Sequence, residues 1–193
     1  MRCYSCHRPS REVICDRCLQ RDFRPVHRVR RIGSLEVHSF FGYPFLEPLL
    51  LTKHHPEGWR IYRWMARKFL APFFETFGAG LEEDLFVLGI DEVPKRGYAH
   101  IAALTHELRH APHIRPLHAK LLAGEHVSYA GRSLAYRLDH PRDFHYRGPR
   151  GIEAVLVDDV ITSGITLQEG YETLRREEVD VLFAVTLADA EVI

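Results

Sequence analysis

Three apolar runs in the second half of the chain predict buried β-strands, at residues 85–90, 155–157 and 181–187. Each run is hydrophobic at successive positions, which is typical of parallel strands that are covered on both faces. Helical spacing follows the first run from residue 99 to 110 and the second from 165 to about 178. Strands that alternate with helices indicate an α/β protein built on a parallel sheet.

The first half of the chain has weaker patterns. Residues 33–41 alternate like a strand, and a hairpin is expected there, before prolines and the loop at 53–58 interrupt the chain. Residues 59–70 have helical spacing, with an apolar stripe beside an arginine stripe. Residues 123–150 follow no clean period, which is typical of a mobile loop or hood over a site.

The composition is that of a globular chain with one principal domain and a small appendage. The 193 residues, 46% of them apolar, can bury a normal core. No run approaches the roughly 18 consecutive apolar residues of a membrane span. We therefore expect a cytoplasmic protein without an integral membrane segment. The expected division is a module at residues 1–31 and a larger domain at residues 32–193.

All four cysteines lie in the first module, at Cys3, Cys6, Cys15 and Cys18. The spacing C-x2-C-x8-C-x2-C lets two pairs of thiolates surround a zinc ion tetrahedrally. A module this small cannot bury a core by itself, so the metal would supply its folding energy. A complete shell of four thiolates leaves no open position for catalysis, so the zinc would be structural. The alternative is two disulfides, and the lack of an apolar leader after Met1 argues against it.

The segment 155–166 joins an apolar strand to two carboxylates, Asp158 and Asp159, and to a hydroxyl-rich turn. Ligands of open α/β sheets bind at the carboxyl ends of the strands, where this acidic pair is expected. Carboxylates accept hydrogen bonds from vicinal sugar hydroxyls. The turn at 162–166 offers hydroxyls and backbone N–H groups at the start of a helix, which favours a phosphate. The segment therefore predicts a site for a phosphorylated sugar.

Two considerations limit this interpretation. An Asp-Asp turn followed by a capped helix is common in α/β proteins and would need no ligand. Successive strand residues also point to opposite sides of a sheet. Only one of the two carboxylates can therefore face a ligand squarely, unless the strand ends before the pair.

Positive charge is concentrated at the start of the chain, although the formal net charge is zero. Residues 1–31 contain nine arginines and three acidic residues, whereas the remainder contains 17 lysines and arginines and 23 acidic residues. Such a module attracts a polyanion in a salt-dependent way, or it is a solvated face or a contact with the acidic domain. Aromatic residues in the 59–70 helix could stack on unpaired bases, or they could be core. The predicted contacts to single-stranded DNA are Arg28, Arg30, Arg31, Arg60, Arg63 and Arg67.

Residues 106–110 read His-Glu-Leu-Arg-His and match H-E-x-x-H, the zinc and general-base signature of metalloproteases. On a helix the two histidines would face one way. Pro112 ends the helix within a turn, however, and Arg109 would place a cation beside the metal. We therefore expect these histidines to lie on a helix surface, with a zinc hydrolase as a remote alternative.

The 155–166 segment resembles the phosphoribosyl pyrophosphate (PRPP) motif of type I phosphoribosyltransferases. In that motif four apolar residues, an acidic pair and a Thr-Thr/Ser-Gly-x-Thr/Ser loop follow in this order. The resemblance implies that Asp158 and Asp159 hold the ribose 2- and 3-hydroxyls, that the 162–166 loop holds the 5-phosphate, and that Mg²⁺ binds with PRPP. It also implies a type I phosphoribosyltransferase-like parallel sheet flanked by helices. The PRPP-binding residues carried over are Val157, Asp158, Asp159, Val160, Thr162, Ser163, Gly164, Ile165 and Thr166.

The whole chain resembles the ComF/ComFC family of competence proteins. The shared features, in order, are the four-cysteine head, Lys53 ahead of an aromatic helix, the element at 96–98 and the PRPP motif. The chain departs from the family where residues 98–100 read Tyr-Ala-His instead of Phe-Asn-Gln. It also departs at 129–137, where the hood pattern keeps Gly, Ser and Arg but loses Gln and Leu.

The ComF resemblance implies a role in natural transformation, in which incoming single-stranded DNA is received in the cytoplasm or at the inner membrane, beside other DNA-uptake machinery. Asp158 and Asp159 would orient the sugar in any displacement of pyrophosphate from ribose C1. Lys95 and Arg96 would neutralise the leaving pyrophosphate, and Arg137 would close the hood. No acceptor follows from the family. The alternative is an active phosphoribosyltransferase of nucleotide or nucleobase metabolism.

Overall fold

The computed structural model describes residues 1–90, 98–124 and 142–191. Its strands are β1 (Arg28–Ile32), β2 (Leu35–Gly42), β3 (Leu85–Gly89), β4 (Ile114–Leu117), β5 (Leu121–Ala123), β6 (Phe144–Tyr146), β7 (Ile152–Ile161) and β8 (Val179–Asp189). Its α-helices are α1 (Asp16–Asp22), α2 (Tyr43–Leu50), α3 (Gly58–Met65), α4 (Ala71–Gly78), α5 (His100–Glu107) and α7 (Ile165–Arg176). Two 3₁₀-helices, η1 (Leu51–His54) and η3 (Leu108–His110), and a π-helical turn, η2 (Ala66–Leu70), complete these ranges. None of the helices in them has both the length and the hydrophobicity of a membrane span.

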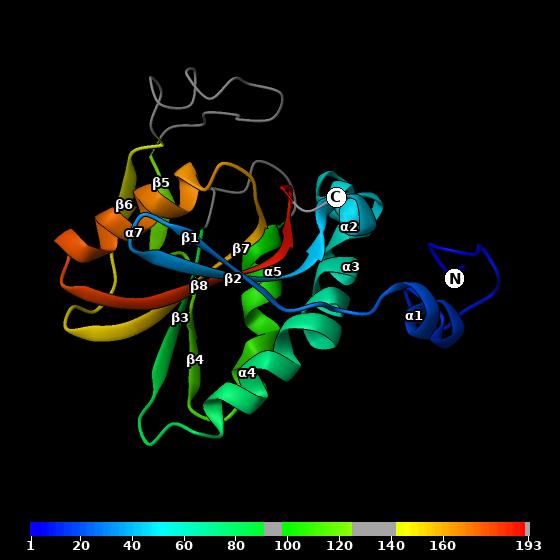
Figure 1. Cartoon of the computed structure of the whole chain (residues 1–193), viewed down its shortest axis with the longest axis horizontal. Helices are drawn as coiled ribbons and strands as arrows, with labels where there is room; N and C mark the ends of the chain where they lie inside the picture. The colour runs from blue at the N-terminus through cyan, green and yellow to red at the C-terminus, as the bar shows by residue number, and fades with distance from the viewer. Residues whose placement is uncertain (91–97, 125–141, 192–193) are drawn as a thin grey trace.

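Within the described residues, the larger sheet has six strands in the order β1-β2-β8-β7-β3-β4 (Figure 1). Strands β1 and β2 form the expected hairpin and pair antiparallel, whereas the other neighbours in this sheet pair in parallel. Strands β5 and β6 form a separate antiparallel pair. The prediction of an α/β protein with a mostly parallel sheet is confirmed.

Two hydrophobic clusters cover the two faces of the sheet. Alternate residues of β7 divide between them. Val155 and Val157 pack with α2 to α5, whereas Ala154 and Leu156 pack with α7 and the β5–β6 pair. Figure 1 shows α3 and α4 on one side of the strands and α7 on the other. The central strands thus bury both faces, which explains their uninterrupted apolar runs.

The order of the sheet changes direction between β3 and β7. From β3 the chain passes through α5 to β4 on one side, and from β7 it passes through α7 to β8 on the other. Right-handed crossovers in opposite directions place α5 and α7 on opposite faces. The carboxyl ends of β3 and β7 therefore flank the crevice where open α/β sheets bind ligands.

Several elements differ from the sequence predictions. Strand β7 runs on to Ile161 because it continues to pair with β8, so the acidic pair lies inside the strand and not after it. The helix predicted for 59–70 continues through η2 and α4 to Gly78. It can do so because Pro72 lies in the first turn of α4, where prolines are tolerated. Strand β6 lies inside the segment 123–150, which was expected to be a loop, and β4 carried no pattern of its own; both depend on pairing with a neighbour.

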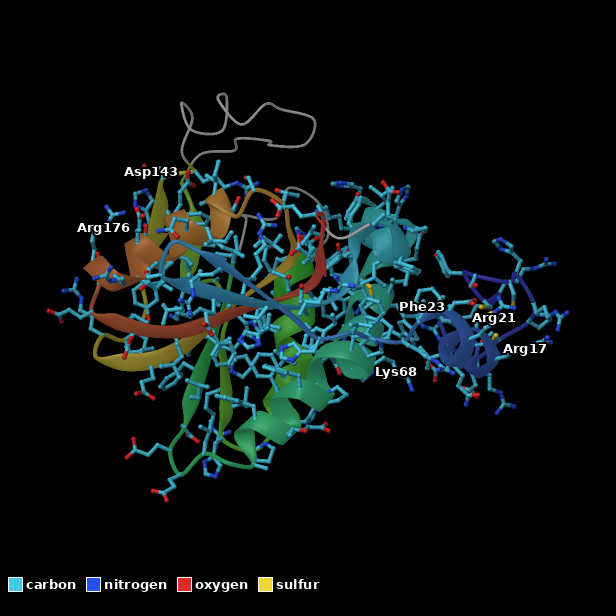
Figure 2. All side chains as sticks on the ribbon, in the orientation of Figure 1. Arg17, Arg21, Phe23, Lys68, Asp143 and Arg176 are labelled. Atoms are coloured by element: carbon cyan, nitrogen blue, oxygen red, sulfur yellow. The ribbon has the colours of Figure 1, made fainter. Side chains whose placement is uncertain are left out.

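The N-terminal residues form a small lobe at the end of the molecule opposite α7 (Figures 1 and 2). An isolated bridge joins Arg2 to Pro9, and α1 follows. Val13 and Ile14 are each 1% exposed and belong to the same hydrophobic cluster as α2 to α5. The lobe is therefore packed onto the helical layer and does not merely extend from it.

Candidate functional site

The acidic pair is divided between the two faces of β7. Val155 and Val157 face the helical layer, and Asp159 lies on the same side, where it contacts Tyr62 of α3. Ala154 and Leu156 face α7, and Asp158 follows them in the alternation of the strand. The alternation changes after the pair, because Val160 packs on the helical-layer cluster and Ile161 on the α7 cluster. Asp159 is buried, with 5% of its surface exposed, whereas Asp158 is half-buried. Two adjacent carboxylates thus occupy different environments at one point of the sheet.

Three side chains from the helical layer surround Asp159. Lys53 Nζ lies 3.0 Å from Asp159 Oδ2, and the Tyr62 hydroxyl donates to the same oxygen at 2.8 Å. His100 Nε2 lies 3.7 Å from that oxygen. The Tyr62 hydroxyl is also 3.0 Å from the carbonyl oxygen of Leu50. Asp159 thereby ties η1, α3 and α5 to the end of β7.

These contacts fix the charge of Asp159. Burial by itself raises the pKa of this carboxyl group. The charges of Lys53 and His100 and the hydroxyl of Tyr62 act in the opposite direction, and together they lower the pKa of Asp159 to about 2. The side chain is therefore a carboxylate at neutral pH, with Oδ2 already satisfied. Such a group holds its neighbours in place better than it accepts a new ligand.

Asp158 is in the opposite situation. Its Oδ1 accepts the backbone N–H of Asp159 at 2.8 Å. Burial and the negative charge of Asp159 raise the pKa of Asp158 well above its usual range, and the backbone N–H of Asp159 and the charge of Arg142 offset only part of this effect. Asp158 is consequently the member of the pair that gains most from a hydroxyl donor or a cation.

The turn after β7 leads directly into α7. Thr162, Ser163 and Gly164 form the turn, and α7 begins at Ile165. Gly164 has a φ of +80°, in the left-handed region that favours glycine. It is also the N-cap of α7 and makes no side-chain cap. Gly164 gives the helix no side-chain cap, and the first N–H groups of this 12-residue helix follow directly on the turn at the end of β7.

The four cysteines of the lobe come together. Their Sγ atoms all lie within 4.8 Å of one another, and no other group of three or more potential metal ligands was found in the described residues. The Sγ atoms of Cys6 and Cys15 are 3.8 Å apart. Thiolates around a tetrahedral zinc ion stand about 3.8 Å apart, whereas a disulfide needs about 2.05 Å. The four sulfurs could therefore hold a tetrahedral metal ion.

The H-E-x-x-H segment has a structural use in this fold. Glu107 is 4% exposed and accepts hydrogen bonds from Arg63 and from Arg67, the latter at 3.1 Å. Burial raises the pKa of Glu107, but the two arginines outweigh it and lower the pKa. His106 lies against His118, with ring centroids 5.9 Å apart. The glutamate is held by two arginines, so the described residues give the remote hydrolase alternative no ligand geometry.

Most of the arginines predicted to contact DNA pair with carboxylates of the chain itself. Arg30 lies 3.0 Å from Asp189 and 2.7 Å from Glu191. Arg31 contacts Glu36. Arg63 of α3 and Arg67 of η2 both pair with the buried Glu107 of α5. Their charges are largely compensated within the protein.

Arg28 and Arg60 remain exposed, and Arg60 donates to the carbonyl oxygen of Arg11 at 3.2 Å. Figure 2 shows further arginines on the cysteine lobe, among them Arg17 and Arg21 of α1. Arg21 pairs with Asp22 at 2.6 Å, and Arg60 reaches the lobe through Arg11, so part of the exposed positive charge lies at the lobe.

The aromatic residues of α3 divide between core and surface. Tyr62 and Trp64 are 0% and 1% exposed, so the core interpretation holds for both. Trp59 is 41% exposed, and the guanidinium of Arg63 lies 5.2 Å from its ring centroid. Only this tryptophan of the helix offers a stacking surface.

Lys95, Arg96 and Arg137 lie outside the described residues, as does the hood segment at 129–137. Ile90 is the last described residue before the gap at 91–97. Its backbone N–H donates to the carbonyl oxygen of Val157 at 2.9 Å. Ile90 itself therefore lies beside β7.

The pattern of the sequence did not reveal the surroundings of Asp159. Lys53 entered only as a family feature, and His100 only as a departure from a family motif. Tyr62 reads as one aromatic residue among several. These side chains come from different helices, and only the packing of those helices on the sheet brings them to one carboxylate. The sequence feature that could have indicated these partners is the presence of polar residues in segments that adjoin the carboxyl edge of a parallel sheet.

Comparison with known proteins yields structural neighbours only. No family model and no curated protein matches the chain. Similar solved structures include UMP synthase from Leishmania donovani, with 18% identity and a TM-score of 0.41 over 73% of this chain and 24% of that one. Adenine phosphoribosyltransferase from Saccharomyces cerevisiae has 16% identity and a TM-score of 0.43 over 86% of this chain and 84% of that one. Orotate phosphoribosyltransferase from Aeropyrum pernix has 17% identity and a TM-score of 0.37 over 90% of this chain and 80% of that one. These identities and TM-scores are too low to identify a function.

Proposed function

We propose that the carboxyl end of β7 binds PRPP together with Mg²⁺, as a phosphoribosyltransferase-like domain. The observation that carries this proposal is the run from Asp158 to the Thr162–Gly164 turn, at the point where the sheet order changes direction. An acceptor for sugar hydroxyls and a helix N-terminus whose N-cap is a glycine lie there in one segment. This combination suits a sugar phosphate better than either group alone.

The two carboxylates have different parts in this proposal. Asp158 accepts a ribose hydroxyl and lies on the α7 face, which also presents the turn for the 5-phosphate. Asp159 is the fixed charge that keeps Lys53 and Tyr62 at the edge of the site. Its charge also favours the positive charge that develops on the sugar in an oxocarbenium-like transition state. Neither group needs to transfer a proton.

The oxygen-rich donor set fits Mg²⁺, because this ion prefers carboxylate and phosphate oxygens. Asp158 would help to hold it, since burial and Asp159 raise the pKa of this carboxyl group and a cation relieves that cost. Mg²⁺ when bound neutralises charge on the pyrophosphate oxygens. Lys95, Arg96 and Arg137 are proposed to add positive charge there.

In a complete reaction, the bond between ribose C1 and the pyrophosphate oxygen breaks. Pyrophosphate leaves with the bonding electrons, and an acceptor attacks C1. The chain's part is to orient the sugar and to neutralise charge. The acceptor is unassigned, so the enzyme is proposed at the level of the reaction class.

The cysteine cluster is proposed to hold a structural zinc ion. Four sulfurs complete a tetrahedral shell and leave no position for a reacting water. Residues 1–31 are accordingly proposed as a zinc-stabilised module, and residues 32–193 as the phosphoribosyltransferase-like domain. Loss of zinc should then loosen the lobe before it affects the sheet.

A second proposed function is the handling of single-stranded DNA in the cytoplasm during natural transformation, beside other uptake components, as the resemblance to ComF proteins implies. It is favoured by the exposed arginines near the lobe and by Trp59, whose exposed ring could stack on an unpaired base. Since Arg30, Arg31 and the arginines bound to Glu107 are paired internally, Arg28 and Arg60 would supply more of the attraction to phosphates. An affinity that stays constant between low and high salt would contradict this attraction.

The first experiment is a calorimetric titration with PRPP, with and without Mg²⁺. The wild type is compared with Asp158→Asn and with Glu153→Gln, a change at an exposed position near the start of the same strand. We expect Mg²⁺-dependent binding by the wild type and by the Glu153 variant, and an affinity on the order of 100-fold lower in the Asp158 variant. A wild type that binds no PRPP would overturn the proposal.

Pyrophosphate release then separates the candidate functions. Turnover with a free nucleobase would favour an enzyme of nucleotide or nucleobase metabolism. PRPP binding without turnover, combined with salt-dependent binding of single-stranded DNA, would favour the competence role.

A further inference from the structure

The β1–β2 hairpin lies against the turn that is proposed to bind phosphate. A Cβ atom at Gly164 would stand 2.8 Å from Cγ1 and 2.9 Å from Cδ1 of Ile32, so the Ile32 side chain is seated directly on this glycine. Gly33, at the tip of the hairpin, faces the side-chain amide of Gln168. The Ser34 hydroxyl donates to the hydroxyl oxygen of Tyr171 at 3.1 Å. The hairpin therefore follows α7 from its N-cap through its second turn.

The same strand also holds the chain on the other side of the turn. Arg30 pairs with Asp189, at the end of β8. The next residue, Ala190, donates its N–H to the carbonyl oxygen of Ile161, the last residue of β7. The turn at 162–164 is thus bracketed by contacts that lead back to β1, through Ile32 at its end and through Arg30 near its start.

We propose that β1 positions the Thr162–Gly164 turn for phosphate binding and that Ile32 is the positioning residue. The inference rests on the proposed PRPP site and adds an element that lies outside the PRPP motif. A turn that contains a glycine at φ +80° has much conformational freedom, and its N–H groups converge on an anion only if something holds that conformation. The branched side chain of Ile32 fills the space over Gly164 and restricts the turn.

The geometry also explains why the contact needs both partners. Any side chain at Gly164 would collide with Ile32, and a smaller residue at position 32 would leave the glycine uncovered. Ile32 is partly buried and packs against the cluster that includes Leu35 and Leu167, so the core beneath it holds its position. The hairpin therefore restricts the conformation of the turn from outside the PRPP motif.

The test compares Ile32→Ala with Ile32→Val and with Val179→Ala. Val179 is 2% exposed, belongs to the same cluster and pairs with Ile152, at the other end of β7. Two properties are measured: hydrogen exchange of the amides from 162 to 166 without ligand, and calorimetric affinity for ribose 5-phosphate. The Val179 variant controls for a general loss of stability.

We expect Ile32→Ala to accelerate exchange in the turn and to weaken ribose 5-phosphate binding about tenfold. Ile32→Val keeps the branch at Cβ and should stay near the wild type in both. Val179→Ala should lower the melting temperature while leaving the turn and the affinity unchanged. Equal exchange in Ile32→Ala and the wild type would overturn the inference, even if PRPP binds. A wild type that binds neither sugar phosphate would overturn the proposed function, while the exchange data would still decide whether β1 holds the turn.

Discussion

The two sides of β7 at its carboxyl end differ sharply, although they are one residue apart. On the α3 and α5 side, Asp159 is buried and its Oδ2 is contacted by Lys53, Tyr62 and His100. On the α7 side, Asp158 is half-buried and its pKa is raised by burial and by the charge of Asp159. The helical layer supplies three partners to Oδ2 of Asp159, whereas the energetic cost of ionising Asp158 remains for a ligand to lower.

This difference shows how one acidic pair can serve both stability and binding. A carboxylate inside a network of donors stabilises the fold only while its partners remain. A carboxylate with a raised pKa costs stability when it ionises, and it recovers that cost when a cation or donor arrives. The functions of the pair can therefore be separated by substitution at each position.

The largest effect is expected from Asp159→Asn, which removes the charge that Lys53 and His100 compensate. We expect the free energy of unfolding to fall by about 3 kcal/mol, as for the loss of one member of a buried ion pair. Chemical denaturation measures it, with Asp180→Asn at an exposed position of β8 as the control. Because the pKa of Asp159 is lowered to about 2, its stabilisation is present above the ordinary pKa of 3.8 and is lost as the pH falls toward 2. In Asp159→Asn this acid-dependent loss of stability should be absent. If the stability of the variant falls with pH as steeply as that of the wild type, the proposed contacts of Asp159 are contradicted.

Asp158→Asn should have the opposite pattern. Mg²⁺-dependent PRPP affinity should fall on the order of 100-fold, about the effect of losing hydrogen bonds to a charged group. Stability without ligand should stay the same or rise, since the amide never bears the buried charge. The two properties are measured by calorimetry and by denaturation on one preparation. A variant that is destabilised like Asp159→Asn would show that the two sides of β7 are not distinct.

The pH dependence of binding should report Asp158 alone. A raised pKa favours the protonated group in the folded protein, so its contribution to stability is lost as the pH rises through that pKa. Over the same range the affinity for PRPP with Mg²⁺ should increase, by at most about tenfold per pH unit for one proton. Asp158→Asn, titrated in parallel, accounts for the protons of PRPP itself. Parallel curves for wild type and variant would contradict the assignment.

The smallest effect is expected from Tyr62→Phe, which removes one hydroxyl from the network and keeps the ring. The free energy of unfolding should fall by about 1 kcal/mol, the usual net value of a buried hydrogen bond. Tyr171→Phe, which alters a more exposed hydroxyl pair on the α7 side, is the control and should change stability less. If PRPP affinity falls in Tyr62→Phe as much as in Asp158→Asn, the division between the two sides fails.

The sequence predicted the parts of this site that depend on local pattern. The apolar runs predict the parallel strands, the cysteine spacing predicts the cluster, and the segment at 155–166 predicts an acidic strand followed by a turn and a helix. The sequence pattern placed the acidic pair after the strand because the apolar run ends at Val157. Strand pairing with β8 extends β7 beyond that point, and pairing is not a local property.

The remaining features come from tertiary contacts that no spacing encodes. Lys53, Tyr62 and His100 meet Asp159 only because α3 and α5 pack on the same face. The arginine stripe of the 59–70 helix reads as a surface for polyanions, yet Arg63 and Arg67 turn to Glu107 on a neighbouring helix. A sequence shows charge but not which partner the fold supplies.

The order of strands also governs when the protein can fold as it is synthesised. Strand β2 emerges early, yet its parallel neighbour is β8, the last strand of the sheet. Until β8 is available, one edge of β2 and one edge of β7 have no partner, and the apolar faces of both remain incompletely covered. Long-range parallel pairing of this kind is slow and leaves strand edges open to wrong partners. The sheet, and with it the acidic edge, is therefore completed in a late step that depends on the final crossover through α7.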